Sequence, residues 1–192
     1  MVAAPFFVAA GLLIASGLGK LARPTPVVDA LAAAGLPGGR VGARALGVVE
    51  VAVGVGALWR PGVATGLAVA VLYLAFASFL VRLIRRGGAA TCGCVGSGEA
   101  PPSWLHVSLD LAAVVVAAAV AAWPVPSIGS AVAASPLAGV PLVIGLVGAA
   151  VLLAIAVVEV PRAWGSYRPG HEEHVPANPP GPRPIALVER PR

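Results

Sequence analysis

Long apolar runs alternate along this chain with short segments that carry most of the charges. Five runs have the apolar character and approximate length of membrane-spanning helices, because a helix rises about 1.5 Å per residue and the hydrocarbon core of a bilayer is about 30 Å thick. They cover residues 2–19, 45–59, 62–81, 104–123 and 137–160. The pattern predicts an all-α integral membrane helical bundle.

The first connectors are rich in residues that begin, bend or end helices. Within residues 21–44, the pattern predicts a short interfacial helix over residues 27–34, led by Pro26 and Asp29. The sequence Arg60-Pro61-Gly62 is typical of a tight turn. Spans two and three are therefore expected to form an antiparallel hairpin.

The fourth span carries residues typical of helix ends. Ser103 follows two prolines and is the expected N-cap. Trp104 and Trp123 stand at the two ends of the span, where tryptophan anchors a helix at the membrane interface. Residues 124–136 carry no charge and are expected to form a turn region before the fifth span.

The composition excludes an ordinary soluble domain. Of the residues, 58% are apolar and only 11% are charged, and the mean hydropathy is +0.92. So little polar surface cannot cover a water-facing exterior. The pI is near 10.2, but the basic residues stand between the apolar runs, as topology signals of membrane proteins do. The expected partner is therefore the lipid bilayer and not a nucleic acid.

The positive charges predict an orientation in the plasma membrane. The segments after spans one and three and the C-terminal tail are rich in Lys and Arg, whereas the turn after span two has only Arg60. Because positive loops stay in the cytoplasm, the N-terminus is expected outside and the C-terminus inside. We expect a membrane domain over residues 1–123, a further transmembrane helix within residues 124–161 and a disordered Pro-rich cytoplasmic tail over residues 162–192.

Two acids lie inside spans, where a carboxylate at the helix centre costs roughly 2.5–3.5 kcal/mol on insertion scales. Glu50 in span two and Asp110 in span four each lie some turns in from the same side of the membrane, to which Lys20 and Arg44 also belong. Two interpretations of Glu50 stay open. It forms a structural ion pair with Lys20 or Arg44, or it serves as a proton acceptor or ligand.

His106 opens span four and stands four residues before Asp110, on the same helical face. A carboxylate at this spacing can orient the imidazole for proton transfer. A purely structural role near the start of the helix is the other interpretation.

Cys92 and Cys94 are the two cysteines of the chain, and a single glycine separates them. Residues i and i+2 lie up to about 7 Å apart when extended, whereas a disulfide prefers Cα atoms about 4.4–6.8 Å apart, so oxidation needs a bend, which glycine allows. A strained small ring is easily reduced, which suits thiol exchange. Arg85, Arg86 and His106 would favour the reactive thiolate. Three interpretations stay open: a redox pair, metal ligands together with His106 and an acid, or incidental small residues.

The chain resembles the MauE/DoxX group of small membrane proteins, and MauE more closely. The resemblance covers about residues 5–122 and rests on Gly17-Leu18-Gly19-Lys20, Glu50, Cys92-Gly93-Cys94-Val95-Gly96 and His106. It implies a four-helix DoxX-like core associated with redox work. For MauE it further implies methylamine utilisation, through maturation of the disulfide-rich small subunit of methylamine dehydrogenase. The fifth span and the tail extend beyond this core.

Together, residues and resemblance favour a membrane thiol–disulfide redox component in which Cys92 and Cys94 cycle between dithiol and disulfide. His106 is expected to assist proton transfer or to favour the thiolate. A thioredoxin-like protein or a dehydrogenase subunit is the expected partner. The residues expected to support the site are Lys20, Glu50 and Asp110.

The alternative function is a non-catalytic membrane scaffold subunit, or a metal-binding protein that uses Cys92, Cys94 and His106. No Gly-rich phosphate loop follows a predicted strand, because the pattern predicts no strands. We therefore expect no organic cofactor, and under the favoured interpretation no resident metal.

Overall fold

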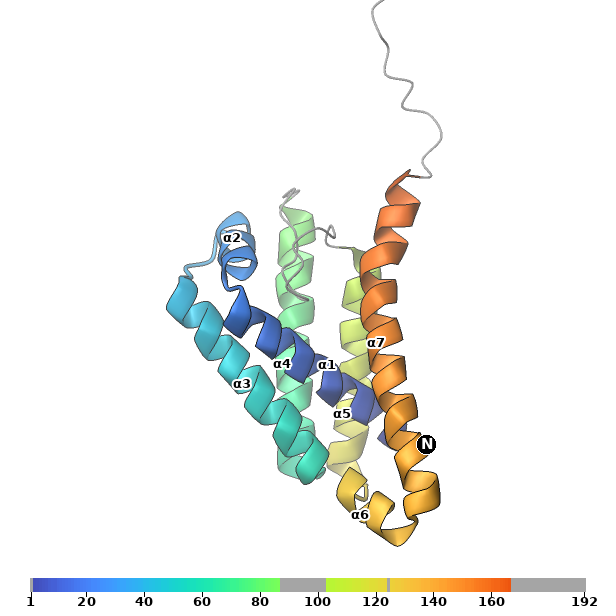
Figure 1. Cartoon of the computed structure of the whole chain (residues 1–192). Coiled ribbons are helices and arrows are strands. Elements are labelled where there is room, and N and C mark those ends of the chain that lie inside the picture. The colour runs from blue at the N-terminus through green and yellow to red at the C-terminus, as the bar shows by residue number, and fades with distance from the viewer. Residues whose placement is uncertain (1, 87–102, 124, 167–192) are drawn as a thin grey trace, which may run out of the picture.

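The computed structural model describes residues 2–86, 103–123 and 125–166 of the chain. All regular structure in these residues is helical (Figure 1). In chain order the helices are α1 Ala3–Ala22, α2 Thr25–Ala33, α3 Arg40–Trp59, α4 Val63–Arg85, α5 Trp104–Ala122, α6 Ile128–Ala134 and α7 Pro136–Ser166.

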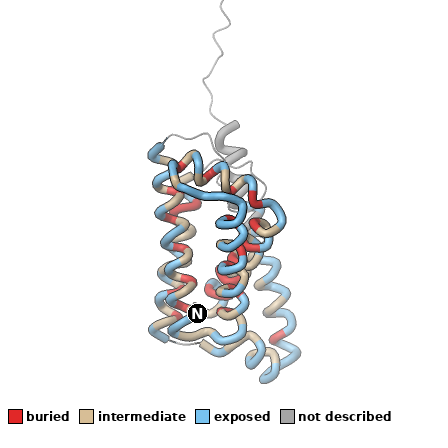
Figure 2. Tube along the Cα trace, turned by 90° about the vertical axis from the view of Figure 1, so that its left-hand side faces the viewer, coloured by how far each residue is buried: buried red, intermediate tan, exposed pale blue. Residues whose placement is uncertain are grey.

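Five of the described helices, α1, α3, α4, α5 and α7, are long and apolar enough to cross a membrane. They form one bundle in which α1 and α3 are tilted against α4, α5 and α7, and the short helices α2 and α6 lie at opposite ends (Figure 1). In α1, α3, α4 and α5, buried positions alternate with exposed ones along the helix, whereas α6 has no buried residue (Figure 2). Large apolar side chains such as Val71, Ile144 and Leu152 are exposed, which suits contact with lipid. The all-α membrane bundle is thus confirmed.

Glycines allow α1 and α3 to pack closely. A Cβ atom added at Gly17 would lie 2.6 Å from the Gly47 carbonyl oxygen, and one added at Gly47 would lie 2.7 Å from the Gly17 carbonyl oxygen. About two turns after Gly47 in α3, a Cβ atom added at Gly54 would lie 2.8 Å from the Ala10 carbonyl oxygen. Small residues permit such backbone approach between membrane helices. The close α1–α3 contact therefore depends on the absence of side chains at these glycines.

We expect Gly47→Ala to lower the unfolding free energy by about 1–3 kcal/mol, because the added methyl group must push the two backbones apart. Thermal unfolding of the purified protein in detergent micelles measures this change. Gly42→Ala, in the same helix, is the matched control, since nothing lies within 4 Å of a Cβ added there. Equal midpoints for the two variants would contradict the close-packing account.

Helices α4 and α5 form the second close pair. A Cβ atom at Gly66 would lie 2.8 Å from both the Ala117 carbonyl oxygen and the Ala121 amide nitrogen. In chain order, the main helix partners are therefore α1 with α3 and α4 with α5. The predicted turn at residues 60–62 joins α3 to α4, but these two helices pack much less on each other than on α1 and α5, so the expected hairpin is not a close helix pair.

The short helix α2 ends in a glycine turn that α4 holds in place. Gly35 has a φ of +60°, and the amides of Gly35 and Leu36 donate to the carbonyls of Ala32 and Leu31 at 2.8 and 2.9 Å. This is a Schellman motif, in which the left-handed position favours glycine. Arg82 Nε donates to the Ala34 carbonyl oxygen at 2.9 Å. The expected short helix is confirmed, although it begins at Thr25 and ends at Ala33, and α4 fixes its C-terminal end.

The end of α4 makes a second contact with this turn, since the Arg86 guanidinium packs against Gly35. A side chain at Gly35 would collide with it. Arg86 was expected to act on the thiols, and the structure gives it this additional structural contact.

The largest differences from the sequence expectations concern α3, α6 and α7. Helix α3 begins at Arg40 rather than at Ala45, and α6 forms within residues 124–136, which were expected to be a turn region. The amide of Ser130 donates to Ser127 Oγ at 3.1 Å, an N-cap that explains the start of α6. Helix α7 continues past Pro161 to Ser166, because a membrane helix tolerates the loss of one backbone donor at proline.

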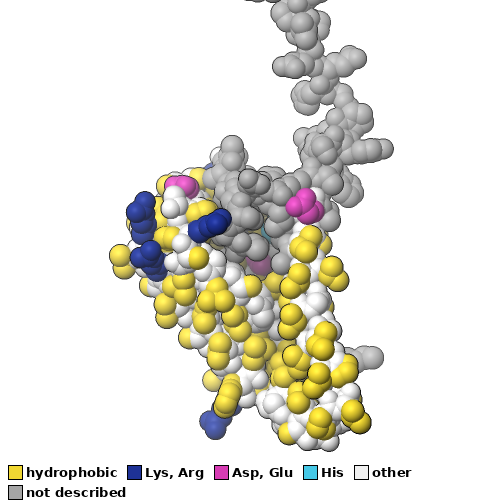
Figure 3. Space-filling model, in the orientation of Figure 1, with side chains coloured by type: hydrophobic (Ala, Val, Ile, Leu, Met, Phe, Trp, Pro, Cys, Tyr) yellow, Lys and Arg dark blue, Asp and Glu magenta, His cyan; other side chains and the backbone are white. Residues whose placement is uncertain are grey.

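Aromatic and charged residues mark the two ends of the bundle. Trp104 and Trp123 are 60% and 72% exposed at the two ends of α5, as expected of interfacial anchors. On the face shown in Figure 3, basic side chains gather at the end that carries α2, and basic atoms also appear at the opposite end. Arg60, in the turn between α3 and α4, belongs to that opposite end. The five candidate spans make this a multi-pass membrane protein.

Candidate functional site: a polar-ended cavity beside a buried ion pair

Cys92 and Cys94, the expected redox pair, belong to the segment between α4 and α5 that lies outside the described residues. The structure describes the other expected site residues. They stand toward the end of the bundle where α1 and α4 end and α3 and α5 begin (Figure 1). These residues are Lys20 in α1, Glu50 in α3, and His106 and Asp110 in α5.

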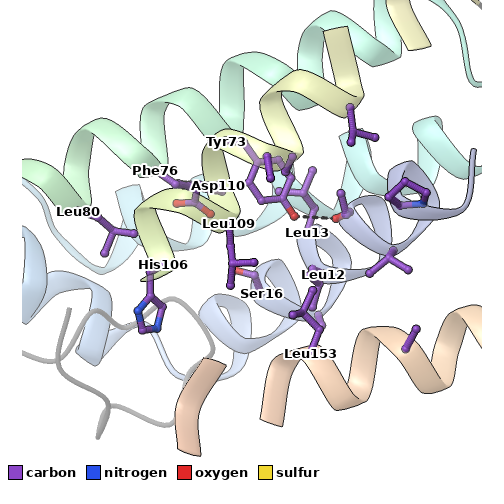
Figure 4. Close-up of a pocket in the computed structure, with 18 residues that line it drawn as sticks. Leu12, Leu13, Ser16, Tyr73, Phe76, Leu80, His106, Leu109, Asp110 and Leu153 are labelled. Atoms are coloured by element: carbon purple, nitrogen blue, oxygen red, sulfur yellow. Dashed lines mark hydrogen bonds between the residues drawn. The ribbon is translucent and has the colours of Figure 1, made fainter. Parts of the chain in front are cut away.

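A cavity of about 370 Å³ lies between α1, α4, α5 and α7. Most of its lining is apolar. Figure 4 shows His106 and Asp110 on successive turns of α5, with Ser16 of α1 and Tyr73 of α4 facing the same space. The cavity therefore unites both expected α5 residues with two polar residues from other helices.

The polar and apolar parts of the lining are separated along the helices. Ser16 lies near the C-terminal end of α1 and His106 in the first turn of α5, at the same end of the cavity. Pro5 and Val116 line its other end. At about 1.5 Å per residue, the helix segments from Pro5 to Ser16 and from His106 to Val116 each rise about 15 Å. The cavity is thus elongated across one part of the membrane, with its polar groups gathered toward one end.

The imidazole of His106 is buried and is held by its own helix start. Ser103 is the N-cap residue of α5, as predicted, with extended backbone angles. Its Oγ lies 2.6 Å from His106 Nδ1 and makes no capping bond to a backbone amide. The hydroxyl thus helps to fix the ring orientation, for which the sequence pattern offered Asp110 as one of two interpretations.

Tyr73 closes the middle of the cavity. Its hydroxyl donates to the Ala9 carbonyl oxygen at 2.8 Å, and its ring packs edge-on against Phe76 with centroids 6.1 Å apart. The tyrosine is buried, so this bond satisfies a polar group deep in the bundle. It joins α4 to α1 across the cavity wall.

Lys20 and Glu50 form a buried ion pair between α1 and α3, with 2.8 Å between Nζ and Oε2. The two side chains are 5% and 0% exposed. Lys20 Nζ also donates to Ser16 Oγ at 2.5 Å and lies 5.4 Å from the centre of the Phe76 ring. The partner of Glu50 is therefore Lys20, whereas Arg44, the other candidate, is exposed.

The second carboxylate oxygen of Glu50, Oε1, is buried and has no hydrogen-bond partner among the residues that the structure describes. A buried acceptor without a partner carries a desolvation cost. Lys20 compensates the charge of the Glu50 carboxylate, while Oε1 of Glu50 stays available to a proton or a water molecule.

Ser16 connects the cavity to the ion pair. Its hydroxyl lines the cavity and accepts a hydrogen bond from Lys20, which in turn binds Glu50. Ser16 was not predicted as a site residue, although it stands one helical turn before Lys20, a spacing that brings two side chains together. Tyr73 and Phe76 were missed as well, because only the tertiary packing brings α4 to this position.

Among the described residues, no group of three or more His, Cys, Asp or Glu side chains lies close enough to hold a metal ion. Any metal set that includes Cys92 or Cys94 lies outside this part of the chain. His106 and Asp110 on their own provide two of the ligand types that a metal would need.

A family model described as methylamine utilisation protein MauE matches residues 1–125. The match includes α1 to α5, with the ion pair, His106, Asp110 and the Cys-Gly-Cys element, and it confirms the resemblance to MauE. No curated protein and no solved structure matches the chain.

Proposed function

The chain belongs to the MauE family of membrane proteins, and from this premise we propose that it is a membrane thiol–disulfide exchange component. It serves methylamine utilisation or the related maturation of a disulfide-containing partner. Cys92 and Cys94 carry the electrons, and a thioredoxin-like protein or a dehydrogenase subunit is the partner. One observation carries the proposal: a buried, oriented imidazole, His106, lies at the start of α5, close in the chain to the Cys-Gly-Cys element.

The exchange moves two electrons and two protons. A partner thiolate attacks one sulfur of the Cys92–Cys94 disulfide, a mixed disulfide forms, and the other sulfur leaves as a thiolate. The second partner thiol then displaces the bound cysteine, so the partner gains a disulfide and the chain gains two thiols. The reverse sequence oxidises the chain. His106 takes up and returns the thiol proton during these steps.

Chain connectivity supports the role of His106. The Cys-Gly-Cys segment begins after Arg86 and ends before Ser103, and Ser103 orients the imidazole. Both flanking residues belong to the end of the bundle where the polar part of the cavity lies. The proposed thiols and the proposed base therefore share one membrane face.

We propose further that the protein lies in the plasma membrane with its N-terminus outside and its C-terminus inside. The basic residues after α1 and α4 stand at one end of the bundle, and positive loops stay in the cytoplasm. In this proposed orientation, the thiol segment is expected on the cytoplasmic side.

Thiol labelling in cells tests both proposals. After acid quenching, a thiol-reactive mass tag is expected to shift the reduced protein by the mass of two tags and to leave the oxidised protein unshifted. Both forms are expected in cells, and treatment with an oxidant or a reductant should convert one into the other. In intact cells, a membrane-permeant maleimide is expected to block the tag and an impermeant one to leave it unaffected. The variant with both Cys92→Ser and Cys94→Ser is the unshifted control.

A pair that stays fully tagged under every condition would overturn the redox proposal. Blocking by the impermeant reagent would reverse the orientation and leave the chemistry untouched. The two proposals therefore fail separately.

A further inference from the structure

The cavity between α1, α4, α5 and α7 has the properties of a binding site for a membrane-dissolved molecule. Its volume of about 370 Å³ lies within the range of about 300–1,000 Å³ that is typical of small-molecule sites. The lining is mostly apolar with a few polar groups toward one end, which is how such sites fix the orientation of a ligand. Thiol exchange with a protein partner uses His106 at the polar end but makes no use of the apolar length of this cavity.

The cavity is accessible from the lipid side of the bundle. Pro5, Ala112 and Ala149 line it and are nevertheless exposed at the protein surface. Helix α7 packs mainly on α1 and α6 and much less on α5. It contributes Ala149 and Leu153, one turn apart on a single helical face. A ligand can therefore enter from the bilayer between α5 and α7.

The polar end selects the chemical class of the ligand head. Ser16, His106 and Asp110 offer a hydroxyl, an imidazole and a carboxyl group, all able to exchange protons with an oxygen atom. An anionic phospholipid head would meet the carboxyl group of Asp110, and the nearby charge of Lys20 is already paired with Glu50. The site therefore favours an uncharged head with carbonyl or hydroxyl oxygens.

The aromatic and apolar lining favours a ring followed by a hydrocarbon chain. Phe76 presents its ring toward the polar end and Tyr73 toward the middle, and Figure 4 shows Leu12, Leu13 and Leu153 on the side away from His106. The whole cavity extends about 15 Å along the helices, so the apolar part beyond a ring at the polar end has room for about one or two isoprenoid units.

We propose that this cavity binds a lipid-soluble prenyl quinone, with its ring between His106, Asp110 and Phe76 and its chain along α1 and α7. The identity of the ligand as an electron acceptor rests on the proposed thiol function. The Cys92–Cys94 dithiol would lose two electrons and two protons and become a disulfide, while the quinone gains both and becomes the hydroquinone. Ser16, His106 and Asp110 are positioned to pass the protons at the ring oxygens.

The site is tested by the binding of a short-chain prenyl quinone to the full-length protein in nanodiscs. Both cysteines are replaced by serine in this protein, so that binding is measured without redox chemistry. We expect saturable binding that Ala113→Phe weakens by at least about tenfold, because the new ring fills the cavity between α1 and α5. Ala118→Phe, on the lipid-facing side of the same helix, is the matched control and should bind as the parent does. Ala149→Phe against Val151→Phe repeats the comparison on α7, where the packing is looser.

Absence of saturable binding, or equal losses in the cavity variants and their controls, would overturn the quinone site. Displacement of the quinone by a neutral diacylglycerol at equal concentration would overturn it in favour of an acyl-lipid site. Quinone binding without oxidation of the wild-type thiols would refute the proposed function and leave the site intact. Thiol cycling without quinone binding would do the reverse.

Discussion

Replacing Glu50 with glutamine is expected to lower the unfolding free energy by about 3–5 kcal/mol, because the change leaves the Lys20 ammonium charged and uncompensated inside the bundle. The pair is 2.8 Å long and both side chains are almost fully buried. Lys20→Met should cost a similar amount by leaving the Glu50 carboxylate alone. Thermal or denaturant unfolding in detergent micelles measures both changes.

The double variant with Lys20→Met and Glu50→Gln separates the pair from its parts. It should be more stable than either single variant, because no uncompensated charge remains. Arg44→Met is the control for a basic residue near the same membrane face. Arg44 is exposed, so its loss should change stability by no more than about 0.5 kcal/mol. Strictly additive losses in the double variant would contradict the buried-pair account.

The same double variant decides between the two interpretations of Glu50. If the pair only fixes α1 against α3, the double variant should keep thiol cycling once its stability has recovered. If the unpartnered Oε1 accepts protons, cycling should be lost although the fold is retained. The path from Ser16 through Lys20 to Glu50 makes the second outcome the expected one.

The sequence alone reduced the partner of Glu50 to two candidates. An acid inside a span demands a partner, and counting spans put Lys20 and Glu50 on the same membrane side. It did not decide between Lys20 and Arg44, because that choice depends on which face of α3 meets α1. The glycine contact between Gly17 and Gly47 sets that face, and a contact between backbones leaves little trace in an apolar pattern.

The cavity was not predictable in the same way. Ser16, Tyr73 and Phe76 come from two helices whose relative rotation is fixed only by tertiary packing. Ser16 was the most accessible of them to sequence reasoning, since it stands one turn from Lys20. Tyr73 gave a weaker indication as a polar aromatic residue in the middle of an apolar span.

Local hydrogen bonds decided the orientation of His106. Asp110, at the i+4 position, was one candidate to orient the imidazole, and the contact of Ser103 Oγ, 2.6 Å from Nδ1, is one that the sequence did not suggest. The hydroxyl of an N-cap serine can form a hydrogen bond with a backbone amide or with a nearby side chain, and the propensity of serine for the N-cap position does not predict which bond forms. The same limitation applies to α6, whose start depends on the hydrogen bond between Ser127 and Ser130.

Cys92→Ser and Cys94→Ser are each expected to abolish thiol cycling, because one sulfur cannot both capture a partner and release it. The remaining cysteine should accumulate as a mixed disulfide with the partner protein, which is visible as a larger, reductant-sensitive species on a non-reducing gel. Mass spectrometry of that species would identify the partner. Full function in both variants would instead support the scaffold alternative, and bound metal lost in either variant would support the metal alternative.

Variants of residues near the start of α5 are expected to slow thiol exchange to different degrees. Their order distinguishes a redox site from an incidental pair of cysteines. His106→Gln should slow exchange by about 10²–10⁴-fold, the usual contribution of a general base, without trapping a mixed disulfide. Ser103→Ala removes the hydroxyl that holds Nδ1 and should slow exchange less, since the imidazole remains but is no longer oriented. Ser108→Ala, an exposed serine on the next turn of α5, is the matched control and should leave the rate unchanged. A proton-transfer role for His106 makes the exchange rate depend on Ser103, which orients the imidazole, but not on Ser108. This order of effects would therefore indicate that the thiols react with the help of the imidazole at the polar end of the cavity.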